Sequence, residues 1–209
     1  MAGDAPVSGP PQPAIDERVR VPTAELMRDL GTRLARLLRP GDLVVLSGQL
    51  GAGKTTLTQG IGAGLGVRGP VTSPTFVIAR VHPSLSGGPD LVHADAYRLG
   101  SRAEVDDLDL DTDIDRSVTV VEWGEGLVEE LAPSFLEIAI AAEPAEPAEP
   151  AEPAEPAEPA ESSAAAAEAE APGDAADEAR TVRVIGWGER WQDAAQAARL
   201  ALSGERTGS

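Results

Sequence analysis

Apolar side chains recur every three or four positions between residues 23 and 38, which places them on one face of a helix. These positions are Leu26, Leu30, Leu34, Leu37 and Leu38. Thr23 is a suitable N-cap, because its side-chain oxygen accepts an otherwise unpaired backbone N–H. Pro40 and Gly41 follow and end the pattern. The spacing therefore predicts an amphipathic helix over 23–38.

A different pattern follows, in which apolar residues run without interruption. The stretch LVVLSG at 43–48 is typical of a parallel strand that is buried on both faces. Glycines come next, and residues 54–65 are compatible with a helix. The chain thus predicts a strand, a glycine-rich loop and a helix in direct succession.

Five further short apolar stretches predict the rest of a sheet. They lie at 75–81, 91–94, 117–121, 136–141 and 181–185. The last two flank a long low-complexity stretch. We expect them to pair as a hairpin with an expanded loop, because the free energy of loop closure grows slowly with length.

The low-complexity stretch repeats the tripeptide Ala-Glu-Pro six times over 142–159. It has little to bury, so it favours a solvated spacer over a partner-binding tract. Residues 141–180 hold 12 acidic residues and one basic residue, which leaves a net charge near −7 for the rest of a chain whose formal charge is −18. We expect a disordered tail over 1–20, a single domain over 21–192 with this insert at 142–179, and a C-terminal helix and tail over 193–209.

The composition excludes several classes of protein. The chain has no cysteine, so disulfide scaffolds and thiolate zinc sites are excluded. Its acidic balance argues against a surface that holds nucleic acid directly, since that needs clustered cations. Proline and glycine interrupt the N-terminal stretch where a signal peptide needs an apolar run, so we expect a cytoplasmic protein without membrane contact.

The glycine-rich loop carries the strongest chemical signal. GQLGAGKT at 48–55 fits the phosphate-binding loop (P-loop) pattern G-x-x-x-x-G-K-[ST], and it lies between the predicted strand and helix. Backbone N–H groups of such a loop converge on phosphate oxygens, and the lysine adds a mobile positive charge. Lys54 is the only lysine among 17 basic residues, which favours a specific need for an ammonium at this position.

Two acidic residues follow predicted strands. Asp95 ends LVHAD, and Glu122 follows a run of buried valines. Either could hold Mg²⁺ or orient water, and the pattern does not decide between them. Asp95 could instead cap a turn, whereas an unpaired Glu122 in this context would be costly to desolvate. We interpret His93, in the strand before Asp95, as a core histidine.

Four motifs in order resemble the TsaE family: GQLGAGKTTLTQG, VTSPTFVIAR, HADAYRL and VVEW. The resemblance implies an α/β fold, a P-loop NTPase-like three-layer sandwich with a mostly parallel central sheet and a C-terminal antiparallel hairpin. It also implies a small ATPase that uses ATP/ADP and Mg²⁺ and is required for threonylcarbamoyl modification of adenosine 37 in tRNAs that read ANN codons. By the same resemblance its partners are the TsaD and TsaB subunits, and tRNA is contacted only indirectly.

The resemblance also assigns roles to residues. Asp95 and Glu122 are the expected catalytic residues, and Thr55 and Glu122 the expected ligands of Mg²⁺. Thr75 lies in a turn that resembles the family's switch-like segment, and Arg180 matches a family arginine in the last hairpin. The residues expected to bind nucleotide are Gly48, Gly51, Ala52, Gly53, Lys54, Thr55, Thr56, Thr75, Trp123 and Arg180.

Two other functions fit a P-loop. A small-molecule kinase would use Asp95 as the base that accepts a substrate hydroxyl proton. The chain has no arginine in its long insert before Arg180, whereas a kinase usually needs an arginine-bearing lid. A nucleotide-dependent binding module without meaningful turnover is the third class.

Overall fold

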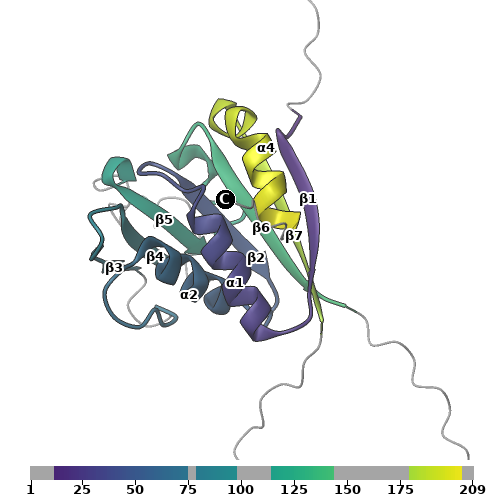
Figure 1. Ribbon diagram of the computed structural model, residues 1–209, viewed down its shortest axis with the longest axis horizontal. Coiled ribbons are helices and arrows are strands. Elements are labelled where there is room, and N and C mark those ends of the chain that lie inside the picture. Colours follow the sequence, from purple (N-terminus) through teal and green to yellow (C-terminus); the bar gives the residue numbers. More distant parts are fainter. Residues whose placement is uncertain (1–11, 75–78, 98–113, 144–178, 204–209) are drawn as a thin grey trace, which may run out of the picture.

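The structure is a computed structural model that describes residues 12–74, 79–97, 114–143 and 179–203. In these residues the chain forms one seven-stranded sheet with the order β1-β7-β6-β2-β5-β4-β3 (Figure 1). The strands are β1 (Ile15–Val21), β2 (Leu43–Gly48), β3 (Ala79–His82), β4 (Asp90–Asp95), β5 (Ser117–Glu122), β6 (Phe135–Ala142) and β7 (Arg180–Trp187).

Parallel pairing is confined to the centre of the sheet. Strands β6, β2, β5 and β4 run parallel to their neighbours in that group, whereas β1, β7 and β3 are added antiparallel. The predicted C-terminal hairpin is confirmed, because β6 pairs antiparallel with β7 from Phe135↔Trp187 to Ala142↔Arg180. The sheet is therefore mixed, and the α/β class is confirmed.

Within the described residues, three α-helices cover one face of the sheet (Figure 1). They are α1 (Ala24–Ala35), α2 (Lys54–Leu65) and α4 (Glu189–Ser203). Helix α1 begins as predicted, because Thr23 Oγ1 accepts a hydrogen bond from the backbone N–H of Leu26 at 3.2 Å. It ends three residues before the predicted limit of 38, where the chain changes to tighter turns.

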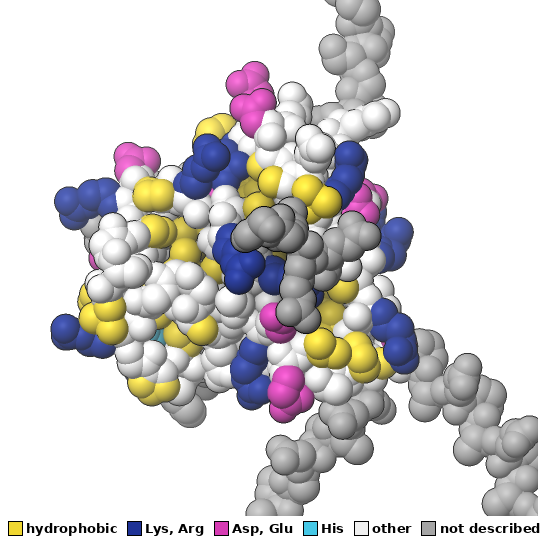
Figure 2. Space-filling view, viewed as in Figure 1, with side chains coloured by type: hydrophobic (Ala, Val, Ile, Leu, Met, Phe, Trp, Pro, Cys, Tyr) yellow, Lys and Arg dark blue, Asp and Glu magenta, His cyan; other side chains and the backbone are white. Residues whose placement is uncertain are grey.

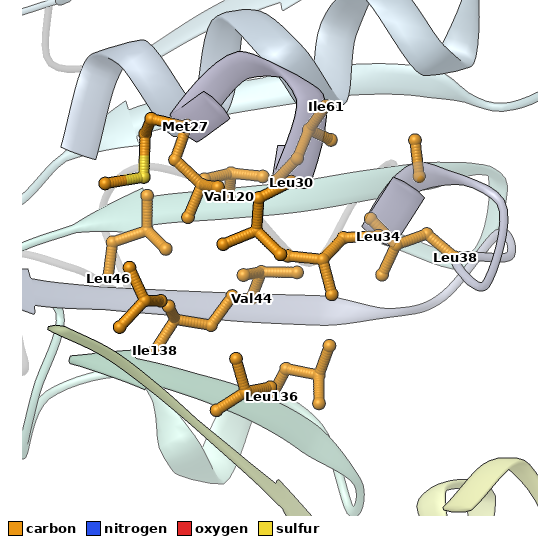
Figure 3. Packing of buried hydrophobic residues seen from close by; sticks show 14 of the residues in the cluster. Met27, Leu30, Leu34, Leu38, Val44, Leu46, Ile61, Val120, Leu136 and Ile138 are labelled. Carbon is orange, nitrogen blue, oxygen red and sulfur yellow. The ribbon is translucent and has the colours of Figure 1, made fainter. Parts of the chain in front are cut away.

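The core under these helices follows the predicted spacing at Leu30, Leu34 and Leu38, but Leu26 is 45% exposed and Met27, which was not predicted, is buried instead. Met27, Leu30 and Leu34 point from α1 toward Val44 and Leu46 of β2 (Figure 3). Burial of side chains of this size stabilises the fold by about 1.5–3 kcal/mol each. The apolar stripe of α1 therefore holds the helix against the strand that leads into the P-loop.

The opposite face of the sheet has a smaller core. Leu43 and Val45 of β2 pack there with Val121, against Val128 and Ala132. The last two belong to the segment 124–134, which includes the 3₁₀-helix η2 (Glu129–Leu131). A second 3₁₀-helix, η1 (Ile114–Arg116), leads into β5. The sheet lies between two layers, as predicted, although the described α-helices all belong to one of them.

Two predicted boundaries were wrong. We expected a disordered tail over 1–20, but Ile15–Val21 forms the edge strand β1, which pairs antiparallel with β7 from Arg180 to Gly186. We also separated a C-terminal helix at 193, but α4 begins at Glu189 and buries Trp191 completely. Both elements therefore belong to the folded unit. Most of the predicted insert, residues 144–178, lies outside the described residues.

Candidate functional site

The P-loop lies between the end of β2 at Gly48 and the start of α2 at Lys54. Gly48 has φ +140°, and a Cβ there would collide with the backbone oxygen of Ile140 on β6. Gly53 has φ +108° and is the N-cap of α2. Both positions need glycine, because side chains rarely tolerate a positive φ. The glycines of the motif therefore allow the tight turn that points the N-terminus of α2 into the P-loop.

Lys54 is buried at the base of this loop. Its ammonium donates hydrogen bonds to the backbone oxygens of Gly48 at 2.7 Å and Gln49 at 2.9 Å, and lies 3.8 Å from the ring centroid of Trp123. Burial lowers the pKa of Lys54, while the charges of Glu122 and Asp95 act in the opposite direction. The side chain thus places a positive charge beside the N-terminus of α2, where unpaired N–H groups also favour anions.

Asp95 and Glu122 meet at the carboxyl ends of β4 and β5. They are directly paired across these parallel strands, and both are buried. Glu122 Oε1 accepts a hydrogen bond from Thr55 Oγ1 at 2.9 Å, whereas Asp95 Oδ1 accepts one from the backbone N–H of Tyr97 at 2.9 Å. Asp95 therefore does cap a turn, and Glu122 is the carboxylate that contacts the P-loop.

These groups open onto one cleft of about 450 Å³. The predicted site residues that line it are Gly51, Ala52, Gly53, Lys54, Thr55, Thr56, Asp95, Glu122 and Trp123. Gly48 contributes its backbone oxygen to Lys54 but is not part of the lining. Thr75 lies outside the described residues.

Arg180 lies at a different cavity. This cavity has about 180 Å³ and is lined by Arg180 and by Thr23, Ala24 and Met27 at the start of α1. It shares Gly51, Gly53 and Thr56 with the main cleft, so both cavities border the P-loop.

Two aromatic residues form a wall of the cleft. The rings of Tyr97 and Trp123 lie 5.2 Å apart at 57°. Trp123 has φ +62°, which is strained for a bulky residue. Its backbone N–H donates to Leu46 O at 2.8 Å, which holds this conformation beside β2. Tyr97 was missed as a site residue, although it lies two positions after Asp95 in the HADAYRL motif.

His93 was interpreted as a core histidine, and it is indeed fully buried. Its Nε2 lies 2.9 Å from Glu122 Oε1, so it also contacts a predicted catalytic residue. Its position two residues before Asp95 was the available signal, because alternate residues of a strand share a face.

The side chains of the cleft that could bind a metal ion suit some cations better than others. In the described part of the chain, no group of three or more His, Asp or Glu side chains could hold a metal ion. The described residues of the cleft thus offer fewer imidazole and carboxylate ligands than a full protein cage needs. Mg²⁺ fits, because proteins usually bind it through one or two side chains and complete its shell with phosphates and water. Thr55 and Glu122 are the adjacent oxygen donors.

A buried strand, a P-loop, a helix that starts at its lysine and acidic residues on neighbouring strands define a P-loop NTPase-like α/β protein. Comparison with known proteins narrows this class. The family model described as "Threonylcarbamoyl adenosine biosynthesis protein TsaE" matches residues 21–149. The chain belongs to the TsaE family, which takes part in the biosynthesis of threonylcarbamoyladenosine in tRNA.

Individual relatives agree with this assignment. The TsaE protein of Streptomyces coelicolor is 57% identical over 169 residues, which cover 80% of this chain and 95% of that protein. The TsaE protein of Bacillus subtilis is 41% identical over 107 residues, which cover 51% of this chain and 65% of that protein. The crystal structure of Bacillus subtilis YdiB superimposes with a TM-score of 0.59 at 25% identity, covering 88% of this chain and 94% of that one. The predicted resemblance and fold class are thereby confirmed.

Among the helices that the structure describes, none combines the length and apolar character needed to cross a bilayer.

Proposed function

We propose that the chain is a Mg²⁺-dependent ATPase that binds and slowly hydrolyses ATP. Its turnover supports the TsaD and TsaB subunits that form threonylcarbamoyladenosine at position 37 of tRNAs reading ANN codons. The observation that carries this proposal is the convergence of Lys54, Thr55 and Glu122 in one cleft at the carboxyl ends of parallel strands. Ligands of open α/β sheets bind at that end.

Binding of the phosphates uses the P-loop backbone and Lys54. The N–H groups at the start of α2 receive the phosphate oxygens, and the Lys54 ammonium exchanges the backbone oxygens of Gly48 and Gln49 for them. The exchange is favourable because charge-assisted hydrogen bonds to phosphate are stronger than those to neutral carbonyls. Trp123 covers the ammonium from one side and keeps it aligned.

Thr55 and Glu122 form the metal side of the cleft. The hydroxyl group of Thr55 donates a hydrogen bond to Glu122, so the lone pairs of the Thr55 oxygen stay available for a metal ion. Bound Mg²⁺ supplies neutralisation of the charge that develops on the β- and γ-phosphates. Glu122 also orients water on this side of the cleft.

Asp95 is the second acid of the reaction. Its Oδ1 is fixed by the N–H of Tyr97, which holds the carboxylate at the cleft wall next to Glu122. A fixed carboxylate at this place accepts a hydrogen bond from the attacking water and aligns it.

The surface supports an indirect connection to tRNA. Lys54 is buried, and on the face seen in Figure 2 the arginine and acidic side chains are interspersed rather than gathered by sign. A formal charge of −18 also opposes binding to phosphate backbones. The chain therefore acts on the modifying subunits, and these contact the tRNA.

ATP hydrolysis by the purified chain with Mg²⁺ tests this proposal, with and without TsaD and TsaB. We expect low activity for the chain alone and clear stimulation by the partners. Lys54→Ala should lower the stimulated rate by about 10²–10³-fold, because it removes a charge that stabilises the transition state. Arg199→Ala is the matched control, because Arg199 is an exposed cation of α4 paired with Glu17.

Normal ATP binding without stimulation by the partners would contradict the proposal. A metabolite screen then separates the two alternatives. Phosphorylation of a small molecule by the isolated chain would indicate a kinase with Asp95 as the base, and no turnover on any acceptor would indicate a passive binding module.

A further inference from the structure

His93 occupies an unusual place for a core residue. It lies in β4, has no exposed surface, and faces the same side of the sheet as Asp95. Its Nε2 is 2.9 Å from Glu122 Oε1. Its second ring nitrogen, Nδ1, is buried and has no hydrogen-bond partner among the residues that the structure describes.

The chemistry of the pair assigns the ring proton. A carboxylate oxygen only accepts hydrogen bonds, so the proton of this contact is on Nε2 of His93. A proton on Nδ1 would instead leave a buried N–H without an acceptor and Nε2 facing the carboxylate without a donor. The hydrogen bond to Glu122 therefore selects the Nε2–H form of the ring.

Packing alone does not account for a histidine at this position. The strand is buried from Leu91 to Asp95, and a leucine would fill a similar volume without a polar atom that lacks a partner. A polar side chain with one unsatisfied nitrogen is costly to bury, so the contact with Glu122 is the feature that distinguishes His93 from an apolar residue.

Glu122 receives two donors on the same oxygen. Thr55 Oγ1 from α2 and His93 Nε2 from β4 both bond to Oε1, each at 2.9 Å. Neither bond uses Oε2. Two donors from different elements fix the carboxylate plane far better than one, because a single bond leaves the carboxylate free to rotate.

We infer that His93 is a positioning residue for hydrolysis, whose Nε2–H holds Oε1 of Glu122 against Thr55 and leaves Oε2 for the metal ion or its water. This inference rests on the proposed ATPase function. His93 acts through Glu122 and does not itself touch nucleotide. Outer partners of this kind orient the residues that contact a metal.

Three variants separate positioning from packing. His93→Leu keeps the volume and removes the donor, whereas His93→Gln restores an N–H at a similar reach. His82→Leu is the matched control, because His82 is also buried, in a neighbouring strand, and also has one ring nitrogen, in its case Nε2, without a partner in the described part of the chain.

Steady-state hydrolysis in the complex with TsaD and TsaB gives the first readout. We expect His93→Leu to lower kcat by about 10–100-fold with KM for ATP unchanged, and His93→Gln to recover most of the loss. His82→Leu should match the wild type. Wild-type kcat in His93→Leu, equal losses in the Gln and Leu variants, or an equal loss in His82→Leu would overturn the inference.

Two further readouts do not depend on turnover. The first is the affinity for ADP with and without Mg²⁺, in which His93→Leu should reduce the gain that Mg²⁺ gives. The second is the ¹⁵N resonances of the imidazole rings, which are few because the chain has two histidines. We expect protonated Nε2 in His93, and a change of this resonance, but not of the His82 resonances, in Glu122→Gln.

These readouts keep the two proposals apart. If the wild-type complex hydrolyses no ATP, the proposed function fails, and the ring proton and the Mg²⁺ effect still decide whether His93 orients Glu122. An Nε2 of His93 that carries no proton, or an unchanged Mg²⁺ effect in His93→Leu, would overturn the inference even in an active enzyme.

Discussion

Buried carboxylates lie at both ends of the parallel strands, but their neighbours differ. Asp42, just before β2, accepts hydrogen bonds on both oxygens from the guanidinium of Arg190 at 3.1 and 3.2 Å and one from the N–H of Arg39 at 2.8 Å. Glu122, at the other end, is bonded by a hydroxyl and an imidazole. The nearby ammonium of Lys54 is bonded to backbone oxygens instead.

The difference between Asp42 and Glu122 indicates how a structural carboxylate can be told from a candidate catalytic one. Burial raises the pKa of Asp42, while the Arg39 N–H and Arg190 lower it, so this carboxylate depends on a permanent cation. Arg190 also donates to Leu37 O at 2.6 Å, so the pair fastens α4 to the connection between α1 and β2. At the Glu122 end the cation is held by groups that a phosphate can replace. Both carboxylates are buried, so burial does not distinguish them. The candidate catalytic site is distinguished by a cation whose hydrogen-bond partners can be exchanged.

The largest effect is expected on stability, from breaking the pair of Asp42 and Arg190. Arg190→Met removes the cation and leaves Asp42 buried with a single N–H, which should lower the free energy of unfolding by about 3–5 kcal/mol. Urea denaturation followed by circular dichroism measures this. Adding Asp42→Leu to the same chain should recover most of the loss, because no uncompensated charge remains. A loss that persists in the double variant would contradict this reading of the pair.

The pH dependence of the same variant sharpens the test. Without Arg190, burial acts on Asp42 with less opposition, so its pKa in the folded state rises further above 3.8. The folded state then binds a proton in a range where the unfolded state does not, and stability falls as pH rises through this range. The deficit against wild type should therefore be largest at neutral pH and shrink as the pH is lowered toward 4. A deficit that is constant over this range would argue against Asp42 as its cause.

The next largest effect is expected at the site end. Glu122→Gln should lower kcat of the stimulated ATPase by about 10²–10³-fold and leave the denaturation midpoint close to wild type. Asp42→Asn is the converse variant: it should lower stability, because an amide N–H₂ would face Arg190, and leave kcat unchanged. Measuring both quantities in both variants decides the comparison. Equal turnover in Glu122→Gln and wild type would exclude a catalytic role for Glu122.

The smallest effect is expected for an ion pair that is not buried. Asp16 of β1 and Arg183 of β7 form two hydrogen bonds of 2.8 Å, but both side chains are exposed. Solvent and salt screen such pairs. Arg183→Ala should therefore leave the denaturation midpoint within experimental error. A shift as large as that of Arg190→Met would mean that bond geometry, rather than burial, sets the strength of these pairs.

The sequence predicted the elements whose pattern is local. The stripe of α1, the apolar run of β2 and the P-loop between β2 and α2 all follow from neighbouring residues. Strand β1 was missed because prolines precede it and its partner β7 lies more than 150 residues away. The early start of α4 was missed because Trp191 contacts distant strands, which no local spacing reveals.

Most residues of the candidate site were predicted from the sequence, but the hydrogen bonds between them were not. The P-loop pattern and the strand ends placed Lys54, Asp95 and Glu122 together, since carboxyl ends of parallel strands meet at one edge. The contact of Glu122 with Thr55 required the register of β2 against β5, in which Leu46 pairs with Glu122. His93 was identified as buried, but its partner lies on the adjacent strand.

The intrinsic fluorescence of Trp123 reports on the cleft. The Lys54 ammonium lies 3.8 Å from the indole centroid, and a charge at this distance alters the emission of the ring. The other two tryptophans, Trp187 and Trp191, are not part of the cleft lining and contribute a constant background. On the proposed function, phosphate replaces the backbone oxygens that hold this ammonium, and we expect the changed surroundings of the charge to alter the fluorescence of the unlabelled protein. We therefore expect that nucleotide binding can be timed without a dye or an altered residue, for the chain alone or with a partner that contains no tryptophan.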